Sequence, residues 1–316
     1  MREVSVIICA YTLDRWAMLE QAVASVLDQW VPVREVVIVI DHNRELLERA
    51  RQRWGTEGGP VPQPVVVPSA GAPGLSGARN TGVAVARSEI VAFLDDDARA
   101  DELWVEHLLA PYEDPTVVAC GGTAVPAIAG ARPAWWPIEF DWVVGCSYLG
   151  LPTGRADVRN LIGANMSLRR DAVVAVGGFP EGIGRVGARP VGCEETDLCI
   201  RVGQRWRSAR VVYEPAARVY HHVPAHRLSW RYFRARCLAE GRSKAQVAAR
   251  VGRERALASE RAYVLRVLPK GVAAAMGATV RGDVRGGLRA AAIAAGLTLT
   301  TVGYVQGRLS LWRYSS

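Results

Sequence analysis

The chain has 316 residues, a mass of 34.2 kDa and a formal net charge of +8. Half of the residues are hydrophobic and 22% are charged, which argues against a disordered chain, a collagen-like chain and a polytopic membrane protein. The six cysteines form no C-x-x-C pair and no zinc spacing, so we expect a reducing compartment without disulfides or a structural metal. The apolar run at the N-terminus is too short for a signal peptide, and we expect a cytoplasmic protein.

The positive charge is concentrated in the last third of the sequence. Residues 1–200 hold 17 Lys and Arg against 26 Asp and Glu, whereas residues 201–316 hold 22 against 5. Such a basic segment favours a polyanionic partner, and the two candidates are nucleic acid and an anionic membrane surface. No zinc spacing, aromatic RNA-binding pattern or phosphate-binding Gly-Lys loop accompanies the charge, so we expect no nucleic acid.

The first hundred residues alternate between strand and helix patterns. The predicted strands are 4–10, 36–40, 65–67 and 90–94, and the predicted helices are 16–30, 44–54 and 78–86. This alternation predicts an α/β fold with a mostly parallel central sheet flanked by helices. Asp41 and Asp95 directly follow two of the strands, at the edge where open α/β sheets bind their ligands.

The rest of the chain changes character twice. Further strands are predicted at 117–120 and 161–168, a proline-rich aromatic stretch at 133–152, and a helix from Glu194. Beyond residue 223, one helical face holds Trp230, Phe233, Cys237 and Gly241. It is flanked by Arg227, Arg231, Arg234 and Arg236, which indicates a basic amphipathic helix. We therefore expect an α/β domain over 1–224 and a basic helical extension over 225–316.

An uncharged segment, 290–305, lies near the C-terminus. It is shorter than the roughly 20 residues that span a bilayer, and Ala, Gly and Thr dilute its hydrophobicity. We therefore expect a packed or interfacial helix there.

Asp95, Asp96 and Asp97 give the sharpest chemical signal in the sequence. Along an extended chain, residues i and i+2 point the same way, so Asp95 and Asp97 can face one ligand while Asp96 faces elsewhere. Two carboxylates favour a hard cation such as Mg²⁺ or Mn²⁺. The alternative is a solvated loop that caps the helix near Asp101.

Five sequence blocks between residues 4 and 223 belong together. They are VSVIICAYTLDR, VVIVIDHN, GLSGARNTGVAVARSEIVAFLDDDA, GANMSLRRDAVVAVGGFPEGIG and CEETDLCIR. In this order they resemble glycosyltransferase family 2, the inverting nucleotide-sugar transferases with a GT-A fold. The resemblance implies transfer of a sugar from a nucleotide-sugar donor, UDP-linked by the family's commonest usage, to a hydroxyl. It also implies Mn²⁺ or Mg²⁺ at the donor diphosphate.

The resemblance places the donor nucleotide at the end of the first strand. The implied donor-binding residues are Ala10, Tyr11, Thr12, Arg15, Asp41, Arg79, Asp95, Asp96 and Asn165. Tyr11 would stack on the base and Asp41 would hydrogen-bond the base or ribose, while Thr12 replaces the family's usual Asn. Arg79 would contact the phosphates, with a salt bridge to a strand-end Asp as the alternative. Asn165 would approach the sugar or, alternatively, make strand-end hydrogen bonds.

The resemblance also supplies the metal ligands and the base. Asp97 is the implied metal ligand, Asp95 is a second candidate, and His221 stands where some relatives supply a histidine; the alternative for His221 is an ordinary core or surface residue. Glu195 is the implied base that takes the acceptor proton. The family commonly has Asp at that position, and the extra methylene of Glu195 changes its reach, so Glu194 remains an alternative base.

Trp135, Trp136 and Trp142 are candidates for the acceptor side. Their flat rings can stack on sugars, or they can form a small satellite core. Asp197 either orders the acceptor or pairs with Arg201 four residues later. The segment 133–150, together with the blocks CEETDLC and RYFRARC, resembles the branch that includes lipid-linked-glucose glucuronosyltransferases.

This branch implies a saccharide or lipid-linked acceptor, a role in cell-envelope polysaccharide synthesis, and a peripheral location on the inner face of a membrane. The basic helix would then meet an anionic membrane surface, with a merely solvated charged face as the alternative.

Two other classes of function are alternatives to a glycosyltransferase. A sugar nucleotidyltransferase would share the nucleotide-binding sheet, but it normally needs a Gly-x-Gly-Thr-Arg loop after the first strand, and residues 10–15 have none. A noncatalytic sugar-nucleotide or membrane-binding protein would keep Asp41 and Asp97 but would lose nothing when Glu195 is removed.

Overall fold

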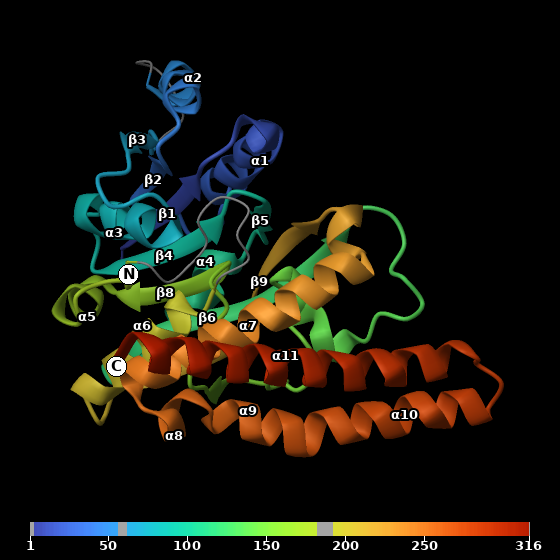
Figure 1. The fold of residues 1–316 in the computed structure, drawn as a ribbon. Helices are drawn as coiled ribbons and strands as arrows, with labels where there is room; N and C mark the ends of the chain where they lie inside the picture. Colours follow the sequence, from blue (N-terminus) through green and yellow to red (C-terminus); the bar gives the residue numbers. More distant parts are fainter. Residues whose placement is uncertain (1–2, 56–61, 182–191, 316) are drawn as a thin grey trace. The chain divides into compact units, whose positions relative to one another are not determined.

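The computed structural model of the chain describes residues 3–55, 62–181 and 192–315 (Figure 1). It contains two compact units. Unit 1 consists of Met1–Val125, Pro152–Arg189 and Glu194–His221, and unit 2 consists of Pro126–Leu151, Pro190–Cys193 and His222–Ser316. The domain boundary that we predict at residue 224 stays a prediction. Unit 2 takes in an internal segment as well as the C-terminal part of the chain.

Unit 1 is built on a mixed β-sheet. The strands are β1 (Val4–Ala10), β2 (Glu35–Ile40), β3 (Val65–Pro68), β4 (Ile90–Asp95), β5 (Ala98–Ala100), β6 (Val117–Ile128), β7 (Ala156–Asp157), β8 (Asn165–Arg169) and β9 (Arg210–Val223). Their order is β3-β2-β1-β4-β8-β6-β9-β5, with β7 paired to β9. The β3-β2-β1-β4 half is parallel, and the β4–β8, β6–β8, β5–β9 and β7–β9 pairs are antiparallel. The predicted α/β fold is confirmed.

Helices cover both faces of this sheet. They are α1 (Trp16–Leu27), α2 (Arg44–Trp54), α3 (Leu75–Val85), α4 (Trp104–Leu109), α5 (Arg170–Ala175) and α6 (Glu194–Arg205). Successive residues of a strand point to opposite faces. Ile8 of β1 belongs to a core cluster with α1, α2 and α4, whereas Ile7 belongs to a second cluster with α3, α5 and α6. Burial on both faces explains why the central strands are continuous apolar runs.

Some element boundaries differ from the sequence-based prediction. The first helix ends at Leu27, so Trp30, which we predicted on its apolar face, is 78% exposed. Pro32 keeps the helix from continuing through Val31, because the residue before a proline disfavours the helical conformation. The strand predicted at 117–120 extends to Ile128, and the one predicted at 161–168 begins only at Asn165.

Unit 2 is mainly helical. Its helices are α7 (Trp230–Val251), α8 (Arg253–Ala256), α9 (Ala258–Ala262), a π-helical turn (Tyr263–Val267), α10 (Leu268–Val280) and α11 (Arg285–Ser315), preceded by short 3-10 helices at Ile138–Val144 and Ala225–Leu228. An aromatic cluster with Trp136, Phe140 and Phe233 forms its core. The predicted C-terminal helical extension is confirmed, but α11 is far longer than the uncharged segment from which we predicted it.

Glycines allow α7 and α11 to pack closely within unit 2. A Cβ atom added to Gly303 of α11 would lie 2.1 Å from the carbonyl oxygen of Leu238, and one added to Gly241 of α7 would lie 2.1 Å from that of Thr300. Real side chains do not approach a backbone so closely, so only glycine fits at these two positions. Of the predicted apolar face of α7, Phe233, Cys237 and Gly241 are buried in unit 2, whereas Trp230 is 42% exposed.

The structure corrects the prediction of an outward basic face on α7, and Arg227, which precedes the helix, is one of the arginines found buried. We expected Arg236 on an outward basic face, but Arg236 is buried and its Nη2 lies 3.4 Å from Oε2 of Glu240. Arg231 and Arg234 remain exposed. Part of the positive charge of α7 is therefore buried and paired inside unit 2.

Substitution of the α11 glycines should separate close packing from helix propensity. Gly303→Ala should lower the free energy of unfolding by about 1–3 kcal/mol, because the new methyl group collides with the α7 backbone. Gly287→Ala is the matched control, since its Cβ meets nothing closer than 3.9 Å and alanine favours a helix by about 1 kcal/mol. Thermal and denaturant unfolding measure both variants. Equal stability of the two variants would contradict the close contact.

Candidate active site

The parallel half of the sheet in unit 1 brings polar residues together at one edge. Ala10 is the last residue of β1 and pairs with Ile40, which Asp41 follows. On the other side of β1, Cys9 pairs with Asp95, the last residue of β4. The residues that follow β1, β2 and β4 therefore lie at the same edge of the sheet, as the sequence predicted.

Tyr11 and Asp41 form one side of this edge. Tyr11 is 37% exposed, and its backbone carbonyl oxygen accepts a hydrogen bond from Nδ2 of Asn43 at 3.0 Å. Asp41 Oδ2 accepts the N–H of Gly74 at 2.9 Å, and Asp41 Oδ1 lies 2.8 Å from Nδ1 of His42. Two neighbours thus fix the orientation of the Asp41 carboxylate.

Three of these neighbours are absent from the sequence-based site. Asn43 also caps α2 by accepting the N–H of Leu46, and Gly74 precedes α3 with a φ of 125° that favours glycine. His42 adopts a left-handed φ of 51°. An Asn before a helical run and a Gly before the next helix are recognisable signals, but they do not indicate contact with Asp41.

Arg15 joins the first strand end to the aspartate triplet. Its Nη1 lies 2.7 Å from Asp96 Oδ1 and 3.1 Å from Asp97 Oδ2, and its guanidinium carbon lies 5.5 Å from the centre of the Tyr11 ring. Burial and the neighbouring Asp97 raise the pKa of Asp96 to about 7, although Arg15 lowers it. Thr12 accepts the N–H of Asp14 and so caps the short 3-10 helix that carries Arg15.

Asp95, Asp97 and His221 form a cluster of three metal-binding side chains. The chain turns after Asp95 into β5, and the antiparallel register places Ala98 opposite His221 of β9. One ligand atom from each side chain lies within 4.8 Å of the others, and His221 Nε2 lies 3.2 Å from Asp97 Oδ1. Two carboxylate oxygens and one imidazole nitrogen suit Mn²⁺, and the carboxylates alone suit Mg²⁺. The residues present therefore fit a divalent cation.

Arg79 connects this cluster with the start of α6. Its side chain is buried in unit 1; Nη1 lies 2.9 Å from Glu194 Oε1, and Nη2 donates to the carbonyl oxygen of Gly163 at 3.0 Å and lies 3.6 Å from Asp95 Oδ1. Burial lowers the pKa of Arg79, but Glu194 and Asp95 raise it, and the result is above the ordinary value. Arg79 is therefore a buried cation between two carboxylates. The alternative in which Arg79 forms a salt bridge with a strand-end Asp is met by Asp95, but the shorter contact of Arg79 is with Glu194.

The first turn of α6 presents carboxylates in different surroundings. Glu194 is buried, and among the described residues its Oε2 has no hydrogen-bond partner. Glu195 is only partly buried. Asp197 is fully buried, and its Oδ2 lies 2.5 Å from Nε of Arg201, which is the i,i+4 pair that we predicted. Of these three carboxylates, Glu195 has the greatest access to solvent.

Asn165 is fully buried at the start of β8. Its Oδ1 accepts the indole N–H of Trp104 at 2.8 Å, and its Nδ2 donates to the carbonyl oxygens of Thr123 at 3.0 Å and Ala217 at 2.8 Å. These bonds tie β8 to β6 and β9, which matches the strand-end alternative. A contact with the donor sugar stays a prediction.

The three tryptophans predicted for the acceptor side belong to unit 2. Trp136 is buried and donates to Asp141 Oδ1 at 2.8 Å, and Trp135 makes an edge contact with Trp230 at 5.3 Å between ring centres. Trp142 donates to the hydroxyl of Tyr263 at 3.4 Å. This packing matches the satellite-core alternative, and stacking on sugars stays a prediction.

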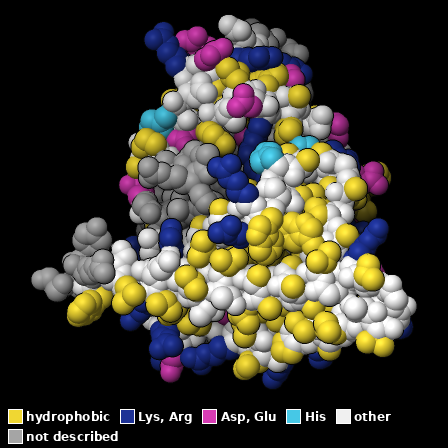
Figure 2. Space-filling view, turned by 45° about the vertical axis from the view of Figure 1, so that its right-hand side comes forward, with side chains coloured by type: hydrophobic (Ala, Val, Ile, Leu, Met, Phe, Trp, Pro, Cys, Tyr) yellow, Lys and Arg dark blue, Asp and Glu magenta, His cyan; other side chains and the backbone are white. Residues whose placement is uncertain are grey.

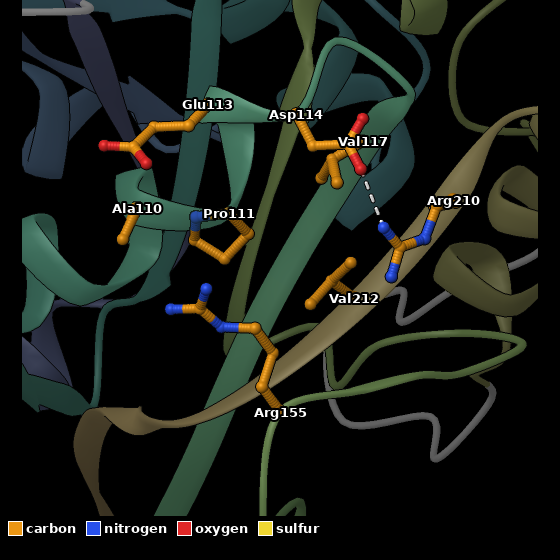
Figure 3. Close-up of a pocket in the computed structure, with 8 residues that line it drawn as sticks. All are labelled: Ala110, Pro111, Glu113, Asp114, Val117, Arg155, Arg210 and Val212. Atoms are coloured by element: carbon orange, nitrogen blue, oxygen red, sulfur yellow. Dashed lines mark hydrogen bonds and ion pairs between the residues drawn. The ribbon is translucent and has the colours of Figure 1, made fainter.

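A pocket of about 290 Å³ lies elsewhere in unit 1 (Figure 3). Its lining residues are Ala110, Pro111, Glu113, Asp114, Val117, Arg155, Arg210 and Val212. Arg210 pairs with Asp114 at 2.7 Å, and Arg155 pairs with Glu214 at 2.6 Å. Val212 stands near the start of β9 and His221 near its end, roughly 30 Å apart along an extended strand. The pocket is therefore separate from the carboxylate cluster, and both of its arginines are already paired.

Known proteins resemble the chain over most of its length. The sequence model described as "Glycosyl transferase family 2" matches residues 5–177. The chain is 35% identical to a glucosyl-dolichyl phosphate glucuronosyltransferase of Haloferax volcanii over 243 residues, which are 77% of this chain and 76% of that protein. It is 33% identical to a pre-mycofactocin glycosyltransferase of Mycobacterium tuberculosis over 183 residues, 56% of this chain, and spans only 35% of that protein.

Solved structures share the fold at low sequence identity. A mannosyltransferase of Pyrobaculum calidifontis in complex with GDP-Man and Mn²⁺ superposes with a TM-score of 0.62 at 20% identity, covering 99% of this chain and 88% of that one. GalNAc-T7 with UDP, GalNAc and Mn²⁺ gives a TM-score of 0.55 at 17% identity, covering 76% of this chain and 47% of that one. With the family match over more than half of its residues, this chain belongs to glycosyltransferase family 2, and it is a glycosyltransferase that uses a nucleotide-sugar donor.

Proposed function

We propose that this glycosyltransferase moves a sugar from a UDP-linked donor to a hydroxyl of a saccharide or lipid-linked acceptor, with inversion and with a divalent cation. The observation that carries the proposal is the Arg79 contact, which joins the Asp95 side of the carboxylate cluster to the α6 turn that holds Glu194 and Glu195. Metal-binding residues and a candidate base are thereby held at one edge of the sheet in unit 1. Membership of the family sets aside a nucleotidyltransferase and a noncatalytic binding protein.

The donor nucleotide fits the open side of this edge. We assign base stacking to Tyr11 and a base or ribose hydrogen bond to Asp41, whose carboxylate is held by Gly74 and His42. UDP is proposed because it is the family's commonest carrier and because GalNAc-T7 was solved with UDP, whereas the Pyrobaculum enzyme was solved with GDP-Man. Arg15 stands between the Tyr11 ring and the aspartates, where its charge can face a diphosphate.

Asp97, Asp95 and His221 would hold the cation. A bound divalent cation would neutralise the negative charge that develops on the leaving diphosphate. Among these residues, Asp97 and His221 are buried and in contact, which limits their movement, while the Asp95 side chain keeps 29% exposure toward solvent.

Glu195 is the proposed base. A base must reach the acceptor hydroxyl, and Glu195 is the partly exposed carboxylate at the start of α6. Glu194 is closed off from solvent, and its charge is balanced by Arg79. We therefore assign Glu194 to positioning and Glu195 to removing the acceptor proton as the anomeric carbon is attacked and the nucleotide leaves from the opposite face.

The acceptor and the location are proposed from the relatives. The Haloferax protein is named a glucuronosyltransferase acting on glucosyl-dolichyl phosphate, so we propose a glucuronosyl or hexosyl transfer to a lipid-linked saccharide. Such an acceptor is presented at a membrane. We accordingly propose a cytoplasmic protein bound peripherally to the inner face of a membrane, in the synthesis of cell-envelope polysaccharides.

Replacing each of the two glutamates in turn by glutamine should identify the base. Glu195→Gln should lower turnover by roughly 10²- to 10⁴-fold while donor affinity stays near that of the wild type, because a positioned base acts on the acceptor proton. Glu194→Gln should lower turnover less and should also destabilise unit 1, because it leaves the Arg79 charge unbalanced. The measurements are UDP release with a verified acceptor, donor calorimetry and thermal unfolding. The reverse order of the two rates would assign the base to Glu194, and near-normal rates in both variants would refute direct displacement.

Removal of the Asp97 carboxylate should abolish metal-dependent donor binding. Asp97→Ala removes one of three ligand atoms that lie within 4.8 Å of one another, so Mn²⁺ or Mg²⁺ should no longer strengthen the affinity for UDP. Calorimetry with and without each cation measures the effect and shows which metal is preferred. Glu48→Gln, an exposed carboxylate on α2, is the control and should behave as the wild type. An unchanged metal-dependent affinity in Asp97→Ala would contradict this ligand set.

A further inference from the structure

From Leu288 to Val305 the outward face of α11 carries no charged side chain, and the exposed Arg308 immediately precedes Leu309. Five large apolar residues are exposed along it, namely Leu288, Val302, Val305, Leu309 and Trp312. The exposed positions between Leu288 and Val302 on this face include Ala291, Ala294 and Thr298, which are also uncharged. At 1.5 Å per residue the stripe from Leu288 to Trp312 is about 36 Å long. A helix face that meets only water is normally polar.

The segment formed by the π-helical turn Tyr263–Val267, α10 and the Arg281 that follows it adds a second apolar stripe with a cationic edge. Leu265, Met276 and Val280 are exposed, and so are Arg266, Lys270 and Arg281. Residues 265–312 contain six Lys and Arg but a single acidic residue, Asp283, whose carboxylate pairs with Arg289 at 2.7 Å. Figure 2 shows hydrophobic side chains along the helices in the lower part of the view, with Lys and Arg among and below them.

We propose that these two stripes form one surface, here called the lipid face, which docks on a lipid bilayer that contains anionic lipids. The lipid face consists of Leu265, Met276, Val280, Leu288, Val302, Val305, Leu309 and Trp312, bordered by Arg266, Lys270 and Arg281. Apolar side chains beside cations match the boundary between acyl chains and anionic headgroups. Trp312 stands at the end of the stripe, and tryptophan favours that boundary.

A second copy of the chain fits this surface less well. A symmetric dimer places the same patch of both copies face to face. Wherever the cationic edge then falls on the second copy, the same patch offers no unpaired acid to balance it, because the only acid of residues 265–312, Asp283, already pairs with Arg289. An anionic bilayer balances the same charges, which is why we assign the face to lipid.

The packing of unit 2 favours docking over spanning. Residues 285–312 are long and apolar enough to cross a membrane by length and composition alone. The opposite face of α11, however, packs on α7 through Gly303 and Gly307, and Arg242 of α7 donates to Oε1 of Gln306 at 2.7 Å. A spanning helix would have to leave these contacts. We therefore place α11 along the bilayer surface with one face in lipid.

This surface differs from the arginine face of α7 that the sequence suggested. Arg236 of that face is buried, and only Arg231 and Arg234 remain available. The inference rests on the proposed function only for its purpose, since a lipid-linked acceptor would be presented at the bilayer. Docking itself is measured without any transfer reaction, so its failure and the failure of the proposed function are distinguishable.

Vesicle flotation of the full-length chain tests the lipid face. The wild type should float with phosphatidylcholine vesicles and more strongly when phosphatidylglycerol is added, and salt should reduce the difference. A triple variant, Val302→Gln, Val305→Gln and Leu309→Gln, should lower the partition coefficient on the order of tenfold or more. Replacing Arg266, Lys270 and Arg281 by Gln should remove the preference for anionic vesicles, at roughly fivefold per residue.

Matched variants separate the lipid face from a general loss of hydrophobicity or charge. Trp30→Gln with Val174→Gln removes exposed apolar side chains from unit 1 and should leave flotation unchanged. Arg231→Gln with Arg234→Gln removes exposed cations of α7 and should change it little. Circular dichroism, thermal unfolding and UDP affinity should match the wild type in the triple variant, because the three replaced side chains are exposed.

Four results would overturn the inference. They are no flotation of the wild type, equal flotation of the triple variant, loss of flotation in the α7 variant alone, and wild-type protein that resists extraction from vesicles at alkaline pH, which indicates a spanning helix. Self-association that the triple variant abolishes, without vesicle binding, would assign the face to a second copy. Normal flotation without glycosyl transfer would refute the proposed function and leave the lipid face intact.

Discussion

The candidate active site depends on one buried cation, the guanidinium of Arg79. Its partners are Glu194 at the start of α6 and, at a longer distance, Asp95 at the end of β4. An ion buried without a partner costs on the order of several kcal/mol, so neither helix nor strand can move away without exposing an unbalanced charge. The position of the α6 turn that holds Glu194 and Glu195 is therefore linked to the stability of unit 1, and a change at Arg79 would affect both.

Negative charge at this edge also explains why a cation is expected. Asp95, Asp96 and Asp97 repel one another, and the pKa of Asp96, raised to about 7 by burial and by Asp97, reflects that repulsion. Arg15 and Arg79 already balance carboxylates. A donor diphosphate would bring further negative charge to the same place. Arg15 and Arg79 would then have to balance both the diphosphate and the carboxylates. A divalent cation held by Asp95, Asp97 and His221 is the simplest way to bring the donor and the acids together.

Local patterns predicted the elements better than their contacts. The strands of the parallel half follow from their apolar runs. Asp95 and Asp97 do come together as predicted, but through a turn at Asp96 and Asp97 and not through the two-residue period of an extended chain. The pairing of Arg79 with Glu194 could not be predicted from the residues, because 115 positions separate them and only the packing of α3 and α6 on one face of the sheet joins them. The place of His221 likewise depends on the register of β5 with β9, which no local pattern encodes.

Net charge is a poor guide to the surface of unit 2. The segment 201–316 is strongly basic, yet its cations are partly consumed by internal contacts, such as Arg236 with Glu240 and Arg289 with Asp283. A helical wheel of α7 gives its apolar face, but it does not reveal that Arg236 is buried and donates to the carbonyl oxygen of Val143 at 3.4 Å. The feature left exposed along α11 is an uncharged stripe. Because apolar surface is costly in water, that stripe, rather than the sum of charges, indicates where unit 2 needs a partner.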